Sequence, residues 1–237
     1  MSKIIIKNLT KKFNNKIVVN NLVLEIKSGE LFAYIGPNGA GKTTTIRILL
    51  QIIKPTKGKI KMIGNNDNFL PKEKIGFVLE EETPFGNFTP EEYLQFYAEI
   101  YKVKEKKQKI QELLKKFSLY TMKKQKVSKF SKGMKRKLCV AKALIGNPEV
   151  LFLDEPLEGI EIEARKEIKD ILLEMKKDKI IFLTSHNLYE IEPLCNSFGI
   201  IIDGVFMGKW LQESLDGKSL EEFYFRIKEK YKNENSY

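Results

Sequence analysis

The stretch Gly36-Pro37-Asn38-Gly39-Ala40-Gly41-Lys42-Thr43 has the spacing G-x-x-x-x-G-K-[ST] of a phosphate-binding loop. Residues 30–35 before it are apolar and strand-like, and residues 44–50 after it have helical character. In this context the glycines let backbone N–H groups approach a polyphosphate, and the start of the helix favours negative charge. The sequence therefore predicts a nucleotide site in which Lys42 reaches the β- and γ-phosphates and the Thr43 hydroxyl binds Mg²⁺.

The composition is that of a chain with an apolar core, because 42% of its 237 residues are hydrophobic. No apolar run approaches the roughly 18 residues that cross a bilayer, and the N-terminus lacks a stretch typical of a signal peptide. We therefore expect a soluble, cytoplasmic chain that reaches a membrane through another protein. The net charge of +11 would suit nucleic acid, but the lysines are spread along the chain, so we expect solvated helix faces and no nucleic-acid partner. Cys139 and Cys195 lack metal-like spacing and are expected to be reduced core residues.

Hydrophobic patterns divide the chain into three stretches. Short apolar runs before Gly29 predict an antiparallel layer of strands, and helical patterns fill a segment at about 82–146. From Val150 onward, strands alternate with helices, which is typical of a parallel sheet covered on both faces. We expect one domain over residues 1–237: an α/β core of the P-loop NTPase class with a mainly parallel sheet, an antiparallel β layer and an all-helical insertion.

Two further polar sites follow buried strands. The apolar run 150–153 ends in Asp154, placed to hold the Mg²⁺ shell, and Glu155, placed to polarise an attacking water. His186, the only histidine, follows the strand 180–184 at the sheet edge where ligands bind, and can hydrogen-bond a γ-phosphate oxygen. The alternatives are an acidic turn without catalytic function and a histidine in a surface turn.

These motifs, in this order, give a chain that resembles the ATP-binding subunit of an ABC transporter from about Ile4 to Phe225. In that family a signature sequence, usually LSGGQ, contacts the ATP held by the opposite protomer. The matching stretch here is Phe130-Ser131-Lys132-Gly133-Met134. The resemblance implies an ABC-type fold in which Ser131 and the N–H of Gly133 face a γ-phosphate, although Ser131 could serve only as a helix cap.

The same resemblance implies roles for three other positions. Phe13 matches the aromatic residue that stacks on adenine, with an ordinary core phenylalanine as the alternative. Glu80 falls where the family usually has a glutamine that senses Mg²⁺, water and the membrane subunit. Residues 157–161 match the loop that crosses the dimer after the catalytic glutamate.

Several positions depart from the commonest family pattern. Glu80 replaces Gln, Glu161 replaces Asp, and Lys132 and Met134 replace Gly and Gln. The glutamate at position 80 resembles exporter branches that serve drugs, antimicrobial peptides or ions. We expect Lys132 either to reach the phosphate or an acidic residue of the other subunit, or to point into solvent. The departures leave every group required for hydrolysis in place, so they bear on regulation and coupling.

The resemblance implies an ATPase that powers an ABC transporter, an exporter of drugs, antimicrobial peptides or similar compounds. Two copies should form a head-to-tail homodimer around two ATP molecules and dock on a separate transmembrane permease subunit at the cytoplasmic face, through residues 85–101 with Glu80 at the hinge. The aromatics of that segment could instead pack only its own core. The predicted site comprises catalytic Glu155, His186 and Lys42; ATP-binding Phe13, Gly36, Pro37, Asn38, Gly39, Ala40, Gly41, Lys42, Thr43, Thr44, Ser131 and Gly133; and metal-binding Thr43, Asp154 and Glu80.

Three other functions fit parts of the sequence. A soluble ABC ATPase acting on the ribosome or DNA would usually carry two cassettes or a long coiled-coil insertion, and the sequence has neither. A GTPase would need an N-K-x-D motif after the loop, which is absent. A catalytically dead binding module would be expected to lack Glu155 or His186.

Overall fold

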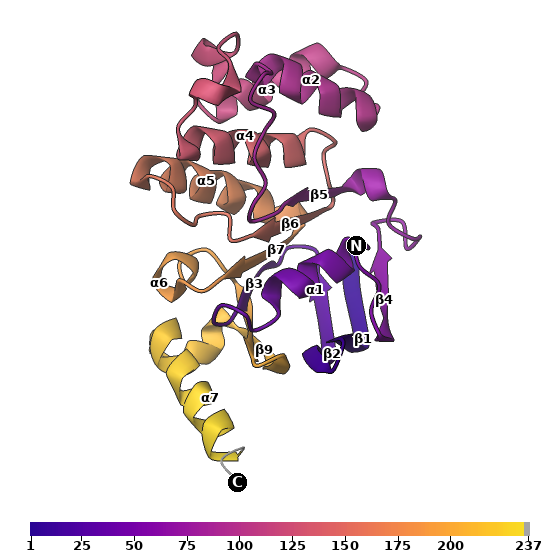
Figure 1. Ribbon diagram of the computed structural model, residues 1–237, viewed down its shortest axis with the longest axis vertical. Helices are drawn as coiled ribbons and strands as arrows, with labels where there is room; N and C mark the ends of the chain where they lie inside the picture. The colour runs from indigo at the N-terminus through magenta and orange to yellow at the C-terminus, as the bar shows by residue number, and fades with distance from the viewer. Residues whose placement is uncertain (235–237) are drawn as a thin grey trace.

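The computed structural model describes residues 1–234, which form a mixed sheet flanked by helices (Figure 1). Residues 235–237, part of the predicted domain, lie outside the described residues. The strands are β1 (Lys3–Phe13), β2 (Lys16–Lys27), β3 (Leu31–Ile35), β4 (Lys57–Ile63), β5 (Ile75–Val78), β6 (Val150–Asp154), β7 (Ile180–Ser185), β8 (Ser197–Ile202) and β9 (Val205–Leu211). Their order across the sheet is β4-β1-β2-β9-β8-β3-β7-β6-β5.

The parallel part of the sheet consists of β8, β3, β7, β6 and β5. Its inner strands β3, β6, β7 and β8 are buried along their whole length, which explains their continuous apolar sequences. In register, Ile35 lies opposite Ser185 and Asp154 opposite Thr184. The carboxyl ends of β3, β6 and β7 therefore meet at one edge of the sheet, where the predicted site residues follow them.

The antiparallel layer is formed by β1 with β2 on one side and β4 on the other. It joins the rest of the sheet through β2 and β9, at the pair Asn20 and Val205. The helix α1 (Lys42–Leu49) packs against this layer and the sheet, and its Ile46 shares one apolar core with Ile4 and Phe182. The phosphate loop is thus fixed between a buried strand and a helix packed on both parts of the sheet.

Three helices gather at one end of the molecule, beyond β5 and β6 (Figure 1). They are α2 (Pro90–Ile100), α3 (Lys106–Lys116) and α4 (Lys132–Leu144). The start of α2 has a capping box, because Thr89 and Glu92 each accept a hydrogen bond from the other's backbone N–H. This group shares a continuous apolar core with the parallel strands. The predicted α/β fold with an antiparallel layer and a helical segment is confirmed.

The remaining helices are α5 (Ile162–Met175), α6 (Leu188–Ile191) and α7 (Leu220–Glu234), the last at the far end of the molecule in Figure 1. After β7 the chain is α-helical only over the four residues of α6 before it reaches β8. Cys139 and Cys195 are both buried and free, and burial raises the pKa of each thiol to about 12. Among residues 1–234, none of the helices combines the length and apolarity needed to cross a membrane.

Candidate active site

The phosphate loop requires its glycines for steric reasons. A Cβ on Gly36 would lie 2.4 Å from the carbonyl oxygen of Ile201, and one on Gly41 would lie 2.5 Å from that of Val18. Gly41 also has a φ of +107°, which other residues rarely adopt. The helix α1 begins with no side-chain cap and no acidic residue in its first turn. Its first N–H groups are therefore left for an anion.

The Lys42 side chain is buried within this loop. Its ammonium donates to the carbonyl oxygens of Gly36 at 2.8 Å and Pro37 at 3.3 Å, and lies 3.2 Å from Glu155 Oε1. The loop thus holds a desolvated cation next to the open start of α1, which is a suitable environment for a polyphosphate.

Asp154 brings a buried carboxylate to the same place. Its Oδ1 accepts a hydrogen bond from Thr184 Oγ1 at 2.6 Å, whereas its buried Oδ2 has no hydrogen-bond partner. Burial raises the pKa of this carboxyl, and the Thr184 hydroxyl and then the nearby Thr43 hydroxyl oppose that effect. A buried carboxylate oxygen without a partner, next to a threonine hydroxyl, is a set of hard oxygen donors that suits Mg²⁺.

A cavity of about 350 Å³ lies between the loop and these acidic groups. Its lining includes Glu80, whose pKa is raised first by partial burial and further by the nearby charges of Asp154 and Glu155. The structure therefore brings Glu80 to the predicted site, although its side chain is largely exposed. The lining residues are Val18, Asn38, Gly39, Gly41, Lys42, Thr43, Thr44, Glu80 and Glu155.

Glu155 links the loop to the histidine. Its backbone has a φ of +46°, an unusual conformation for this residue type, and its N–H donates to Thr184 Oγ1 at 3.0 Å. The side chain is buried, and its Oε1 lies 3.2 Å from both Lys42 Nζ and His186 Nδ1, without hydrogen-bond geometry to either. The strand ends thus bring the three predicted catalytic residues together.

Glu158 is a member of this cluster that the sequence motifs did not predict. Its Oε2 lies 3.2 Å from His186 Nδ1, so the imidazole stands between two carboxylates. The available signals were its position three residues after Glu155 and its place in the loop 157–161 that matches the family. A second carboxylate beside the ring can fix which nitrogen carries the proton and how the ring is oriented.

Phe13 lies at the end of β1 with its ring 45% exposed, and the Lys11 ammonium is 4.6 Å from the ring centre. The alternative of an ordinary core phenylalanine is therefore wrong. The exposed ring can stack on a base, as the family resemblance implies.

The signature stretch forms the start of α4. Ser131 caps the helix by accepting a hydrogen bond from the Met134 N–H at 3.2 Å. The Gly133 N–H is already engaged, because it donates to Glu161 Oε2 of the same chain at 3.0 Å. Lys132 is exposed, as one of the two expectations has it, and its Nζ lies beside Gly159 of its own chain.

Two buried cations of α4 were also missed by the motif search. Arg136 donates to the carbonyl oxygens of Leu79 and Glu80 at 3.0 and 2.7 Å. Lys142 donates to the carbonyl oxygen of Phe77 at 2.8 Å and pairs with Glu82 at 2.7 Å. Charged residues within an otherwise apolar helix were the available signal, because such residues are buried only when paired.

The comparisons with known proteins identify the family of the chain. The family model of the ABC transporter matches residues 19–158. The chain is similar to the uncharacterized ABC transporter ATP-binding protein YcbN of Bacillus subtilis (strain 168), with 36% identity over 90% of this chain and 71% of that protein. It is also similar to the bacitracin transport ATP-binding protein BcrA of Bacillus licheniformis, with 37% identity over 95% of this chain and 75% of that protein.

A solved ATP-binding subunit of an ABC transporter superposes with a TM-score of 0.84 at 29% identity, covering 95% of this chain and 99% of the other. The family match extends over more than half of the chain and includes the phosphate loop, Asp154 and Glu155. The chain therefore belongs to the ABC transporter family, as an ATPase subunit that hydrolyses ATP to power transport.

Proposed function

We propose that two copies of this chain bind two ATP molecules head to tail and drive an exporter through a separate permease subunit at the cytoplasmic face of the membrane. The observation that carries this proposal is that Lys42 and Glu155 line one small cavity beside the phosphate loop, with His186 3.2 Å from Glu155 and Asp154 within reach of both their charges. Relatives named for bacitracin and for lantibiotic transport, with 37% and 34% identity, support export of antimicrobial peptides or similar compounds.

Each side chain has a task in hydrolysis that its position supports. Lys42 exchanges the loop carbonyl oxygens for the β- and γ-phosphates, while Thr43 and Asp154 hold Mg²⁺. The metal ion neutralises charge on the phosphate oxygens when bound. Glu155 polarises the attacking water, and His186, oriented by its carboxylate neighbours, hydrogen-bonds the γ-phosphate.

The second copy supplies what one chain does not bring to the cavity. Ser131 and Gly133 are absent from the cavity lining, and they contact the loop that ends at Glu161. Ile162 and Tyr189 expose 76% and 69% of their surface beside that loop and the histidine. Exposed apolar side chains next to an incomplete site favour a partner surface, and a second copy carries the missing signature stretch.

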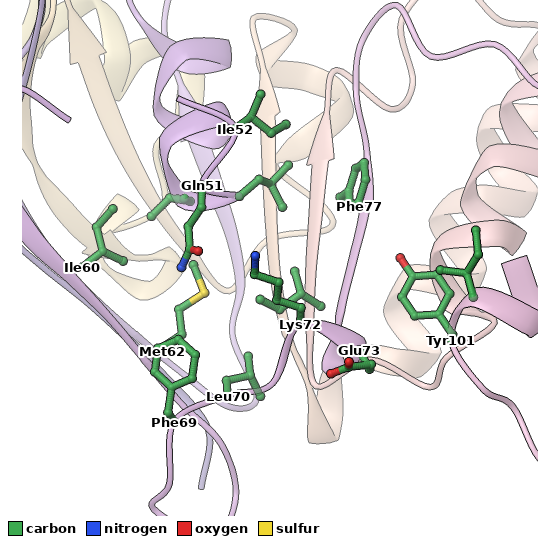
Figure 2. Close-up of a pocket in the computed structure, with 14 residues that line it drawn as sticks. Gln51, Ile52, Ile60, Met62, Phe69, Leu70, Lys72, Glu73, Phe77 and Tyr101 are labelled. Atoms are coloured by element: carbon green, nitrogen blue, oxygen red, sulfur yellow. The ribbon is translucent and has the colours of Figure 1, made fainter. Parts of the chain in front are cut away.

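The surface of this chain has a groove of about 310 Å³ that suits a permease segment (Figure 2). Figure 2 shows Met62 and Phe69 on one side, Phe77 and Tyr101 on the other, and Lys72 between them. The walls come from the end of α1, from β4 and β5, and from the end of α2. We propose that a short permease helix with an apolar face occupies it, because a lone chain would otherwise expose this patch to water.

The predicted docking segment at 85–101 contributes to this surface in two ways. Phe85 and Phe96 pack edge to face in an aromatic cluster with Phe88, so part of the segment forms its own core. Phe85, Phe96 and Ile100 nevertheless stay 47%, 41% and 54% exposed. Ile100 lines the groove itself, and Phe85 and Phe96 add apolar surface outside it, at the α2 side.

The catalytic part of the proposal is tested with Glu155→Gln. We expect the variant to bind Mg-ATP and to run as a dimer in light scattering, because the bound nucleotide is no longer hydrolysed. The wild type should dimerise only transiently. A Glu155→Gln variant that stays monomeric at saturating Mg-ATP would overturn the sandwich.

The docking part is tested with Ile52→Asp, which places a charge in the groove wall, with Val23→Asp as the matched control. Both side chains are apolar and half exposed, at 53% and 55%, but Val23 lies on β2 outside the groove. We expect Ile52→Asp alone to lose co-purification with a multi-span membrane protein while its isolated ATPase activity persists. Equal behaviour of the two variants would refute the groove assignment. Sensitivity of the host to bacitracin after loss of the protein would test the substrate class.

A further inference from the structure

Two of the positions that depart from the family pattern meet in space. Glu161 precedes α5, and Lys132 is the first residue of α4, yet both lie where the loop 157–161 covers the start of α4. Their charges are opposite, and the Lys132 charge contributes to the low pKa of the Glu161 carboxyl. Neither departure is explained by the hydrolysis reaction itself.

The Glu161 carboxylate sits on the first N–H groups of the signature helix. Its Oε2 accepts the Gly133 N–H at 3.0 Å. Its own backbone N–H, the Ser131 side chain and the Gly133 N–H all bond the carboxylate and hold its pKa below the ordinary value. Any Cβ at position 133 would meet Glu161 Oε2 at 2.2 Å, so only glycine allows this approach.

Lys132 lies beside the same loop, near Gly159. Its Nζ lies so near Gly159 that a Cβ there would be 2.2 Å from the ammonium, and Gly159 has a φ of +63°. A glycine at this point lets the lysine lie along its own loop. The start of α4 and the loop 157–161 are therefore joined by the Glu161 carboxylate, and the Lys132 ammonium beside Gly159 adds a favourable charge to this contact.

We infer that Glu161 and Lys132 form an intramolecular clasp, and that the γ-phosphate of the partner's ATP must displace the Glu161 carboxylate from the Gly133 N–H before the nucleotide sandwich closes. This inference rests on the proposed function, because it needs ATP to be shared between two copies. One N–H cannot serve a carboxylate and a phosphate equally well, and the two anions repel each other at hydrogen-bond distance. Glu161 is thus a positioning residue that acts through Gly133.

The clasp sets the ATP concentration at which two copies associate and leaves nucleotide binding by the single chain unchanged. Glutamate reaches one methylene further than the aspartate usual in the family, so Glu161→Asp should loosen the contact. Glu161→Gln keeps the length and removes the charge. Lys132→Gly removes the other half of the clasp.

The experiment uses the Glu155→Gln protein, so that bound ATP is not consumed. Light scattering gives the Mg-ATP concentration of half-dimerisation, and calorimetry at low protein concentration gives the nucleotide affinity of the single chain. We expect Glu161→Asp, Glu161→Gln and Lys132→Gly each to lower the half-dimerisation concentration by about threefold to tenfold, with single-chain affinity unchanged. The Lys132→Gly effect should shrink at high salt.

The matched control is Glu163→Asp, the same substitution in the first turn of α5 outside the clasp. A merely structural role for Glu161 would change thermal stability without separating dimerisation from single-chain binding. Unchanged or raised half-dimerisation concentrations for all three clasp variants would overturn the inference while leaving the proposed function intact. If Glu155→Gln itself forms no ATP-dependent dimer, the proposed function fails and the clasp fails with it.

Discussion

The starts of α1 and α4 both present helix N–H groups toward a proposed phosphate position, but only one of them is open. The helix α1 follows Gly41 and has neither a side-chain cap nor an acidic residue in its first turn. The helix α4 is capped by Ser131, and the Glu161 carboxylate accepts from its Gly133 N–H. The difference indicates an order of events. The phosphate loop binds nucleotide first, and the signature stretch contacts the phosphate only after the Glu161 carboxylate has left the Gly133 N–H.

The largest effect is expected from Glu155→Gln, which removes the charge beside Lys42 and His186 and keeps the side-chain shape. Turnover should fall by about 10²-fold or more, the range for loss of a positioned base. Phosphate release under saturating Mg-ATP measures this. Wild-type turnover in the variant would show that the water is polarised by another group.

The comparison predicts next that Lys42→Ala weakens nucleotide binding by the open loop itself. Loss of a charge-assisted contact should lower the affinity for Mg-ATP by about 10-fold to 100-fold, as measured by calorimetry. His186→Ala is the contrasting variant, since we expect it to bind normally and turn over slowly. Unchanged affinity in Lys42→Ala would contradict the role of the ammonium.

A smaller effect should separate the two helix starts in the nucleotide-free protein. Ser131→Ala removes the cap of α4 and should destabilise the protein by about 1 kcal/mol. At this chain length the melting temperature would fall by roughly 2–4 °C. Thr44→Ala in the uncapped α1 is the control, because no side-chain cap is lost there. Equal melting temperatures for the two variants would remove the contrast between capped and open helices.

An effect of similar size, limited to part of the pH range, concerns Asp154. Burial raises its pKa in the folded protein, so the stability that comes from the protonated carboxyl is present at low pH and is lost as pH rises through that raised pKa. Asp154→Asn should therefore melt higher than the wild type at neutral pH without nucleotide, by ~2–4 °C. The gap should close as pH falls toward the ordinary aspartate value of 3.8. A gap that is constant with pH would assign the effect to packing.

The sequence predicted the parts of the site that follow local rules. The phosphate loop, Asp154 and His186 each follow an apolar strand, and parallel strands bring their carboxyl ends to one edge. What it did not predict depends on contacts between distant segments. Glu158 beside the imidazole is one case, and the Glu161 carboxylate on the Gly133 N–H is another.

The apolar groove could not be predicted for the same reason. Its walls come from segments on either side of β5 that no periodicity in the sequence relates. At Phe13 the sequence prediction holds against its alternative, because the end of β1 leaves the side chain exposed and excludes an ordinary core position.

Two of the buried cations of α4, Arg136 and Lys142, have a mechanical consequence. Lys142 holds the carbonyl oxygen of Phe77 and lies 4.4 Å from the centre of its ring, and Phe77 is also a wall of the groove in Figure 2. Arg136 donates to the carbonyl oxygens of Leu79 and Glu80, which follow Phe77 in the same segment. We therefore expect that a permease helix pushing on Phe77 would tilt α4 as a rigid body. Lys132, at the start of α4, would move with it. Permease movement at Phe77 and release of the clasp at Lys132 would then be coupled through one movement of α4.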